Sequence, residues 1–256
     1  VQSDIKSFRG RDMFTILPIY FHTHIVHFLD IRNARHAKLV LTNSRSLQTA
    51  LGKRYGVTIT TVYPGVDIHS FKPAVKPRRD YVLSVGTITE QKGHRLVVEA
   101  LGLLPVETRP MLIVAGAGGS DRERQLLMML ASSLNVSIEI REARTTQEMA
   151  NLYGNAFALV VGHIYQYLGN NALEAASCGT PIVAVDPSGM VENVKDRVTG
   201  ILVKTRTAEA LAGALGELLQ NPERAEAMGR AGRAYIESYW TWPRAVDDLE
   251  AQFAVA

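Results

Sequence analysis

A glycine turn with a lysine occupies residues 86–93. Gly86 ends the apolar run Tyr81–Val85, and Lys92 with Gly93 opens the next helical pattern. Glycine lets a ligand approach the backbone, and the amides at a helix start attract anions, as does an ammonium group. This turn therefore predicts a phosphate site, with an ordinary structural turn as the alternative.

A second glycine turn precedes a helix that carries a carboxylate. Gly169, Asn170 and Asn171 open the helix, and its first amides can donate to a phosphate. Glu174 lies one turn inside, among small and apolar residues, where a carboxylate without a partner is costly. A ribose diol would be a suitable partner, because hydrogen bonds to a charged group contribute about 1.5–3 kcal/mol. The alternative is that Glu174 only complements the positive end of the helix.

Two further turns give weaker signals. The turn at Gly116 and Gly118 is not a dinucleotide fingerprint, because Asp121 stands where the third glycine belongs and would repel a pyrophosphate. Glu142 follows the next strand pattern, where a dinucleotide-binding site carries an acidic residue, so a nicotinamide dinucleotide site stays a weak alternative. No Gly-Lys-Ser/Thr follows, so a P-loop is not indicated. The turn at 186–192 is either another ligand loop or a proline-glycine turn.

Metal chemistry is not favoured. His22 and His24 alternate as on a strand, whereas His24 and His27 share a helix face, so we expect no single element to present all three. Cys178 is the only cysteine, which excludes an internal disulfide and a four-thiolate centre, and we interpret it as a small packed residue. We therefore expect no metal and no other cofactor.

Strand and helix patterns alternate from residue 81 onward. The strand-like runs are Tyr81–Val85, Pro110–Ala115, Val136–Arg141, Phe157–Val161, Pro181–Val185 and Gly200–Val203. Helical spacing falls at 93–104, 121–134, 145–153, 170–178, 208–220, 222–239 and 243–253, with a short helix at 191–195. This alternation predicts an α/β fold with a doubly wound, Rossmann-like parallel sheet. Ligands of such sheets bind beyond the carboxyl ends of the strands, where the glycine turns lie.

The segment before this alternation is too small for a domain. It predicts strands at Lys38–Leu41 and Thr58–Tyr63 and a helix at Arg45–Tyr55, and a linker rich in proline and basic residues follows at 67–79. We expect residues 1–75 to be the incomplete end of an N-terminal α/β domain with its linker, most of that domain lying upstream. Residues 76–238 would form the Rossmann-like domain, and 239–256 a helix that crosses back.

Composition excludes several classes of protein. The 256 residues are 46% apolar and 21% charged, which is typical of a globular chain, and no apolar run is long enough to span a bilayer. Low cysteine content favours a reducing, cytoplasmic location. The net charge of +3 does not indicate nucleic acid, but residues 1–54 hold nine basic and three acidic residues. That asymmetry indicates either a solvated face or a peripheral contact with an anionic membrane, at its inner surface.

From about Leu41 to Phe253, six motifs occur together in order. They are Pro64-Gly65-Val66-Asp67 with Phe71, Val85-Gly86-Thr87 with Lys92-Gly93, Gly116-Ala117-Gly118, Leu173–Pro181, Ser188-Gly189-Met190-Val191-Glu192 and Thr199–Val203. In this order and spacing the chain resembles the C-terminal half of GT-B glycosyltransferases of family 4. The resemblance implies metal-independent transfer of a hexose, with retention, from a nucleotide diphosphate sugar to an acceptor hydroxyl.

The resemblance also implies roles for individual residues. Lys92 would neutralise the diphosphate and act in catalysis, and Glu174 would bind the ribose. Further phosphate contacts would come from Gly86, Thr87, Gly169, Asn170 and Asn171, and the base would lie near Gly118, Arg141 and Glu142. The implied partners are the nucleotide-sugar donor and a glycan or lipid-linked acceptor held by the N-terminal domain.

One position departs from the family pattern. Gln166 stands eight residues before Glu174, where the family carries the first of two glutamates beside the donor sugar, and Leu168 replaces a usual phenylalanine. Glutamine can hydrogen-bond a hydroxyl but supplies no negative charge, and a loss of a few kcal/mol slows transfer about a hundredfold or more. The alternatives are therefore a transferase with an unusual donor or a slow rate, and a non-catalytic nucleotide-sugar-binding module or degenerate paralogue. A sugar phosphorylase on a similar scaffold is a third.

Overall fold

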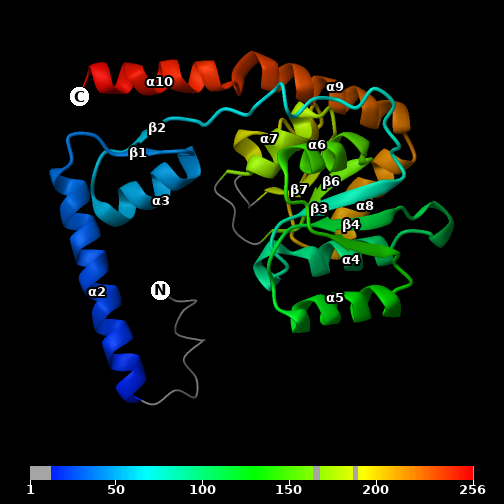
Figure 1. Cartoon of the computed structure of the whole chain (residues 1–256), viewed down its shortest axis with the longest axis horizontal. Helices are drawn as coiled ribbons and strands as arrows, with labels where there is room; N and C mark the ends of the chain where they lie inside the picture. The colour runs from blue at the N-terminus through cyan, green and yellow to red at the C-terminus, as the bar shows by residue number, and fades with distance from the viewer. Residues whose placement is uncertain (1–12, 164–167, 187–189, 256) are drawn as a thin grey trace.

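The computed structural model of the chain describes residues 13–163, 168–186 and 190–255. Its main feature is a six-stranded sheet in the order β5-β4-β3-β6-β7-β8, with every neighbouring pair parallel (Figure 1). The strands are β3 (Tyr81–Val85), β4 (Met111–Ala115), β5 (Ile138–Arg141), β6 (Ala158–Val161), β7 (Ile182–Val185) and β8 (Gly200–Val203). The chain winds outward from β3 to β5, returns to β6 beside β3, and winds outward again to β8. The direction therefore reverses between β3 and β6, which is where ligands bind in such sheets.

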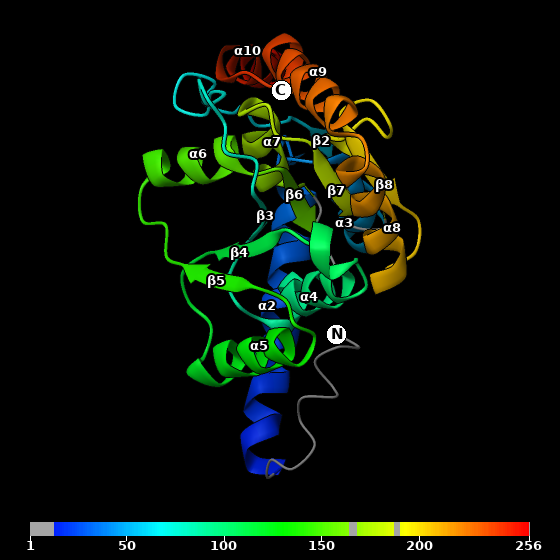
Figure 2. The same cartoon turned by 90° about the vertical axis from the view of Figure 1, so that its right-hand side faces the viewer.

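Helices cover both faces of this sheet (Figure 2). One face carries α4 (His94–Gly102), α5 (Asp121–Ser133) and α8 (Ala208–Leu219), and the other carries α6 (Thr146–Asn155) and α7 (Asn170–Ser177). Helix α9 (Pro222–Tyr239) begins with residues in the first core, Ala225 and Met228, and ends with Ile236 in the second. Val82 and Val114 face the first group of helices, whereas Leu83 and Ile113 face the second. Parallel strands that are buried on both faces appear in the sequence as continuous apolar runs. The predicted α/β fold with a doubly wound parallel sheet is confirmed.

The predicted elements of this sheet and its helices lie close to the observed ones. The bounds of β3, β8 and α9 are as predicted, and most other ends differ by one or two residues. The capping box of Thr145 and Glu148 is present at the start of α6. The short helix expected at 191–195 is wrong in extent, because only the 3-10 turn η4 (Met190–Glu192) forms there. Two further 3-10 turns are η1 (Glu90–Lys92) and η2 (Val106–Thr108).

A two-stranded sheet lies apart from the large one (Figure 1). It pairs β1 (Leu41–Thr42) with β2 (Thr60–Thr61) in parallel and is accompanied by α2 (Met13–His36) and α3 (Arg45–Tyr55). The prediction of α3 is confirmed. The strands predicted at 38–41 and 58–63 are wrong in extent, because the ladder pairs only Leu41 with Thr60 and Thr42 with Thr61. None of the described helices combines the length and apolarity needed to span a membrane.

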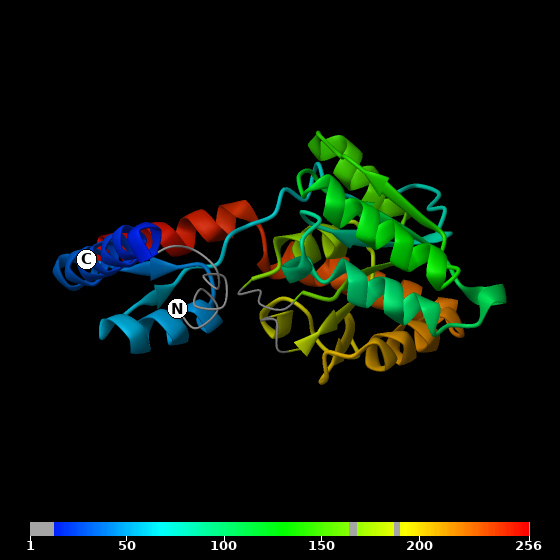
Figure 3. The same ribbon diagram turned by 90° about the horizontal axis from the view of Figure 1, so that it is seen from below.

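Two stretches of chain run side by side between the sheets (Figure 3). Val66 forms an isolated parallel bridge with Thr241, and its amide donates to the carbonyl of Trp240 at 2.8 Å. A Cβ on Gly65 would collide with the backbone of Trp242, so only glycine allows this approach. Helix α10 (Trp242–Ala254) extends from this crossing toward the side of the molecule that holds the small sheet. The domain boundaries at 75/76 and 238/239 stay predictions.

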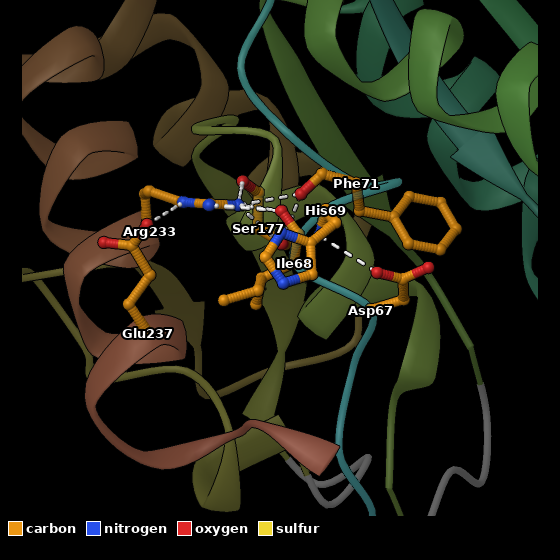
Figure 4. A network of polar contacts seen from close by, with 7 residues as sticks. All are labelled: Asp67, Ile68, His69, Phe71, Ser177, Arg233 and Glu237. Atoms are coloured by element: carbon orange, nitrogen blue, oxygen red, sulfur yellow. Dashed lines mark hydrogen bonds and ion pairs between the residues drawn. The ribbon is translucent and has the colours of Figure 1, made fainter. Parts of the chain in front are cut away.

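Arg233 of α9 fixes the linker to the large domain (Figure 4). Its guanidinium donates to the carbonyls of Phe71 and Ser177 at 2.8 Å and to that of Ile68 at 3.2 Å, while Nε pairs with Glu237 at 2.7 Å. The Ser177 hydroxyl donates to the Phe71 carbonyl at 2.6 Å. The guanidinium is a planar group with five N–H donors, and here it joins the linker to the end of α7. The linker is therefore held in place without secondary structure.

Candidate functional site

The strand order reverses between β3 and β6, and we call this place the switch point of the sheet. It brings the first glycine turn beside the end of β6. Gly86 follows β3 with a φ of +143°, and the stem of Lys92 passes so close that a Cβ there would lie 3.1 Å from Lys92 Cδ. Gly93, with a φ of +71°, precedes α4, and a Cβ on it would collide with the carbonyl of Gly162 after β6. Glycine is required at both positions for backbone conformation and close approach, and together they direct Lys92 across the switch point.

His94 holds the same turn from inside. The side chain is buried, and its Nδ1 lies 2.9 Å from the Ser84 hydroxyl while Nε2 lies 3.2 Å from the Gly86 carbonyl and 3.3 Å from that of Thr87. A carbonyl only accepts, so the neutral ring carries its proton on Nε2 and Nδ1 accepts from Ser84. Burial lowers the pKa of His94, which favours this neutral ring.

The second glycine turn reaches the same place from the other side of the switch point. Gly169 precedes α7, and its carbonyl accepts from the amides of Ala172 and Leu173 at 2.9 and 3.2 Å. The first helical residues are Asn170 and Asn171. The N-terminus of α7, which carries partial positive charge, therefore faces the Lys92 turn across the end of the sheet.

A pocket of about 240 Å³ joins the two turns. Gly86, Lys92, Asn170 and Asn171 line it together, between the carboxyl ends of β3 and β6. Its remaining walls are polar and apolar side chains from the strand ends and the loop after β6, namely Ser84, Val85, Val160, Val161, His163 and Leu168. An ammonium group and a helix N-terminus around one concave space are the groups that an anion site requires. The structure thus brings together two turns that the sequence singled out separately, and anion binding there stays a prediction.

Glu174 lies next to this pocket in the helix but is not part of its lining. Its carboxylate accepts a 2.7 Å hydrogen bond from the hydroxyl of Tyr153 in α6. Burial raises the pKa of Glu174, and the Tyr153 bond acts in the opposite direction. Burial likewise raises the pKa of Tyr153, so the phenol remains the proton donor. The carboxylate therefore has a protein partner in addition to any diol that it could bind.

The three residues expected near the base are not gathered in that pocket. A Cβ on Gly118 would lie 3.3 Å from Thr87 Cγ2. Arg124 connects Gly118 to Glu142 through bonds of 3.1 Å to the Gly118 carbonyl and the Glu142 carboxylate. Arg141 instead pairs with Glu139 on the same strand at 2.5 Å, which raises its pKa. Arg124 thus links Gly118 and Glu142 to each other, and Arg141 belongs to a separate ion pair.

Several sequence-based expectations concern metal and cysteine chemistry. Helix α2 contains positions 22, 24 and 27, so the three histidines belong to one element and not to a strand and a helix. Positions two residues apart lie on nearly opposite sides of a helix, so α2 does not bring all three positions to one face. The alternation of His22 and His24 therefore does not mark a strand. Within the described part of the chain, no three His, Cys, Asp or Glu side chains gather as metal ligands. Cys178 is buried, and burial raises the pKa of its thiol to about 12, as expected of a packed residue. Gln166 lies outside the described residues.

Three residues with a part in this site escaped the sequence analysis. His94 follows Lys92 and Gly93 directly, and a histidine inside an otherwise apolar helix face was an available signal. Tyr153 stands 21 residues before Glu174, with no local pattern that joins them. Asn193 donates to the Gly169 carbonyl at 3.0 Å from the segment 191–195, which the sequence analysis treated only as a short helix with no part in the site.

Comparison with known proteins adds an independent finding. The model of the family "Glycosyl transferases group 1" matches residues 66–235. A D-inositol 3-phosphate glycosyltransferase of Segniliparus rotundus is 32% identical over 213 residues, which cover 77% of this chain and 47% of that protein. One from Nocardiopsis dassonvillei is 29% identical, over 84% of this chain and 55% of that protein. The chain thus spans about half the length of the curated relatives that it matches.

Solved structures share the fold. Sucrose-phosphate synthase from Thermosynechococcus elongatus superposes with a TM-score of 0.78 at 25% identity, over 90% of this chain and 62% of that one. HepE from Anabaena, in complex with UDP-glucose, superposes with a TM-score of 0.78 at 18% identity, over 87% of this chain and 65% of that one. The second likeness is evidence of fold alone.

Proposed function

The chain belongs to the group 1 glycosyltransferases, and from this premise we propose that it serves the transfer of a hexose from a nucleotide diphosphate sugar to an acceptor hydroxyl. The observation that carries the proposal is the pocket in which Lys92 and the N-terminus of α7 converge. Cleavage of the bond between the sugar C1 and the diphosphate leaves negative charge on the departing oxygens. An ammonium group and helix amides stabilise that charge as it develops.

The proposed reaction balances without a redox partner. The acceptor oxygen forms the new bond to C1 as the bond to the diphosphate breaks, and the acceptor proton passes to the departing phosphate. We place the new bond on the same face of the sugar, which gives retention. Lys92 with the amides of Asn170 and Asn171 would neutralise the diphosphate, so no metal is required for departure. Glu174, oriented by Tyr153, would accept from the ribose hydroxyls.

The relatives' names supply the first substrates to try. Inositol phosphates are the acceptors that the matching curated proteins are named for, and UDP-glucose is bound in one structure of the same fold. We therefore propose a hydroxyl-rich acceptor, either a soluble cyclitol or glycan or a lipid-linked one. Titration of this chain with UDP, GDP and ADP, followed by transfer assays with the matching hexose donors, tests the proposal. Failure to bind any of the three nucleotides contradicts it.

A second candidate is a nucleotide-sugar-binding module without turnover. Gln166 favours it, because the position that carries a charged glutamate in the resembled family is neutral here. Calorimetry separates the two candidates: a module binds the donor and releases no nucleotide with any acceptor, whereas a transferase releases nucleotide in proportion to product.

A cytoplasmic, peripheral membrane location is part of the same proposal. The basic excess within residues 1–54 supports it, since an anionic surface attracts such a segment by about 1 kcal/mol per basic residue. Co-sedimentation with phosphatidylserine vesicles at low salt should retain the chain, and neutral vesicles should not. Equal retention by both would remove the membrane contact from the proposal.

A further inference from the structure

Glu192 in η4 binds the start of helix α3, far away in the sequence. Its two carboxylate oxygens accept from the amides of Arg45 and Ser46, each at 2.8 Å, and from the Ser46 hydroxyl at 2.6 Å. The hydroxyl of Tyr63 donates a fourth bond at 2.8 Å. Ser44 caps the next amide of α3, at Leu47, so side-chain oxygens occupy the first three amides of this helix.

This contact favours one arrangement of the two sheets. A carboxylate at a helix N-terminus is stabilised by the helix dipole, and charge-assisted bonds are stronger than neutral ones. These bonds lower the pKa of Glu192 against the opposing effect of burial, so the carboxylate stays charged. Helix α3 accompanies the small sheet, and η4 follows strand β7 of the large one. Glu192 therefore ties the two parts of the chain together.

The same short segment also holds the start of α7. Asn193, which is 2% exposed, donates from Nδ2 to the carbonyl of Gly169 at 3.0 Å. The buried side chain of Met190 packs so tightly on Gly169 that a Cβ there would collide with its Sδ and Cε. Within the segment, the amides of Asn193 and Val194 both donate to the Met190 carbonyl. The turn is thus compact, and a displacement of Glu192 would move Met190 and Asn193 with it.

We propose that Glu192 and Asn193 are positioning residues that make donor affinity depend on the contact between η4 and α3. The start of α7 carries the amides of the anion pocket, and η4 connects it to the N-terminal part of the chain. Interaction of α3 with Glu192 would hold Gly169 where the amides of Asn170 and Asn171 meet the diphosphate. This inference rests on the proposed function, because it takes the pocket to be the diphosphate site.

Affinity for UDP, GDP and ADP is the first measurement, made by calorimetry on the full 256-residue chain. Glu192→Gln keeps one acceptor oxygen but directs an amide group at backbone donors, and it should weaken binding of the best nucleotide at least about fivefold. Asn193→Ala should weaken it similarly. Ser46→Ala and Tyr63→Phe each remove one of the four bonds and lie outside the pocket, so together they should reproduce part of the loss. Glu217→Gln, which removes a carboxylate paired with Arg197, is the matched control and should leave affinity unchanged.

Hydrogen exchange supplies a readout that a purely structural role would not move. Coupling is reciprocal, so saturating nucleotide should slow exchange of the Arg45 and Ser46 amides in the wild type. In Glu192→Gln this protection should disappear. If the wild type binds nucleotide while every variant binds within twofold of it and the exchange at 45–46 does not respond, this inference is wrong and the proposed function stands. A wild type that binds none of the three nucleotides overturns both.

Discussion

The hydroxyl of Tyr153 and the carboxylate of Glu174 form a 2.7 Å hydrogen bond between α6 and α7. Tyr153 is completely buried, and Thr180 anchors its backbone by donating to its carbonyl at 2.6 Å. The phenol is neutral, so it orients the carboxylate without cancelling its charge. Glu174 can therefore still accept a hydrogen bond from a further donor. Burial of its charge costs free energy of folding, because the carboxylate loses water.

The first prediction concerns the pH dependence of that cost. Burial raises the pKa of Glu174 above its ordinary value near 4.5, so the folded state holds the proton more tightly than the unfolded state. The stabilising contribution of the protonated group is complete below the unfolded pKa and is lost as the pH rises through the folded pKa. Glu174→Gln should therefore raise the melting temperature at about pH 7.5 and change it little at about pH 4.

The matched variant for this prediction is Tyr153→Phe. It removes the hydrogen bond and leaves the charge, so it should lower the melting temperature, and more at about pH 7.5 than at about pH 4. Nucleotide affinity should fall in both variants, by about tenfold or more for Glu174→Gln, since a bond to a charged group contributes about 1.5–3 kcal/mol. Parallel melting curves for the wild type and Glu174→Gln at both pH values would contradict the desolvation argument.

The second prediction tests the anion pocket through Lys92. Lys92→Ala should raise the dissociation constant of the best nucleotide diphosphate by about tenfold to a hundredfold, because one charge-assisted contact is lost. The melting temperature should stay close to that of the wild type. Lys53→Ala removes the same charge from α3 and serves as the control. If both variants bound the nucleotide with equal affinity, Lys92 would make no contact with the donor and the prediction would be wrong.

The third prediction tests the close approach that shapes the pocket. Gly93 has a φ of +71° and abuts the Gly162 carbonyl, so Gly93→Ala should lower the free energy of unfolding by at least about 2 kcal/mol. Gly213 in α8 faces open space, since a Cβ on it would meet no neighbouring atom within 4 Å, and Gly213→Ala should stabilise the chain by about 0.5–1 kcal/mol. Urea denaturation measures both. If both variants changed the free energy of unfolding in the same direction, the neighbouring backbone would have moved to accommodate the Cβ at residue 93, and the close approach would not require glycine.

The fourth prediction concerns metal removal. If Lys92 and the start of α7 neutralise the departing diphosphate, EDTA treatment should leave the nucleotide dissociation constant within twofold and nucleotide release unaffected. Calorimetry and a release assay, each repeated with added Mg²⁺ or Mn²⁺, measure this. A tenfold loss with EDTA that either ion restores would place a metal in the donor site.

The sequence predicted the large sheet and its helices well, because buried parallel strands and amphipathic helices leave a periodic pattern. It also predicted the two turns of the pocket, since glycine and helix-start amides are local features. Contacts that depend on folding left no such pattern. The bond from Tyr153 to Glu174 and the bonds from Glu192 to α3 join residues that only the fold brings together. The small sheet was overestimated, because β-branched residues do not by themselves supply a ladder partner.

The last prediction returns to the neutral residue at position 166. A carboxylate beside the donor sugar would stabilise positive charge that develops at C1, so Gln166→Glu should raise the rate of nucleotide release by about tenfold to a hundredfold, or about 1.4–2.7 kcal/mol of barrier. Gln166→Ala is the control and should lower the rate, because it also removes the amide that can bind a sugar hydroxyl. Both rates should be measured at saturating donor, with binding checked by calorimetry. A Gln166→Glu variant that binds the donor as the wild type does, and releases nucleotide no faster, would contradict this prediction and show that the neutral residue at 166 does not by itself limit transfer.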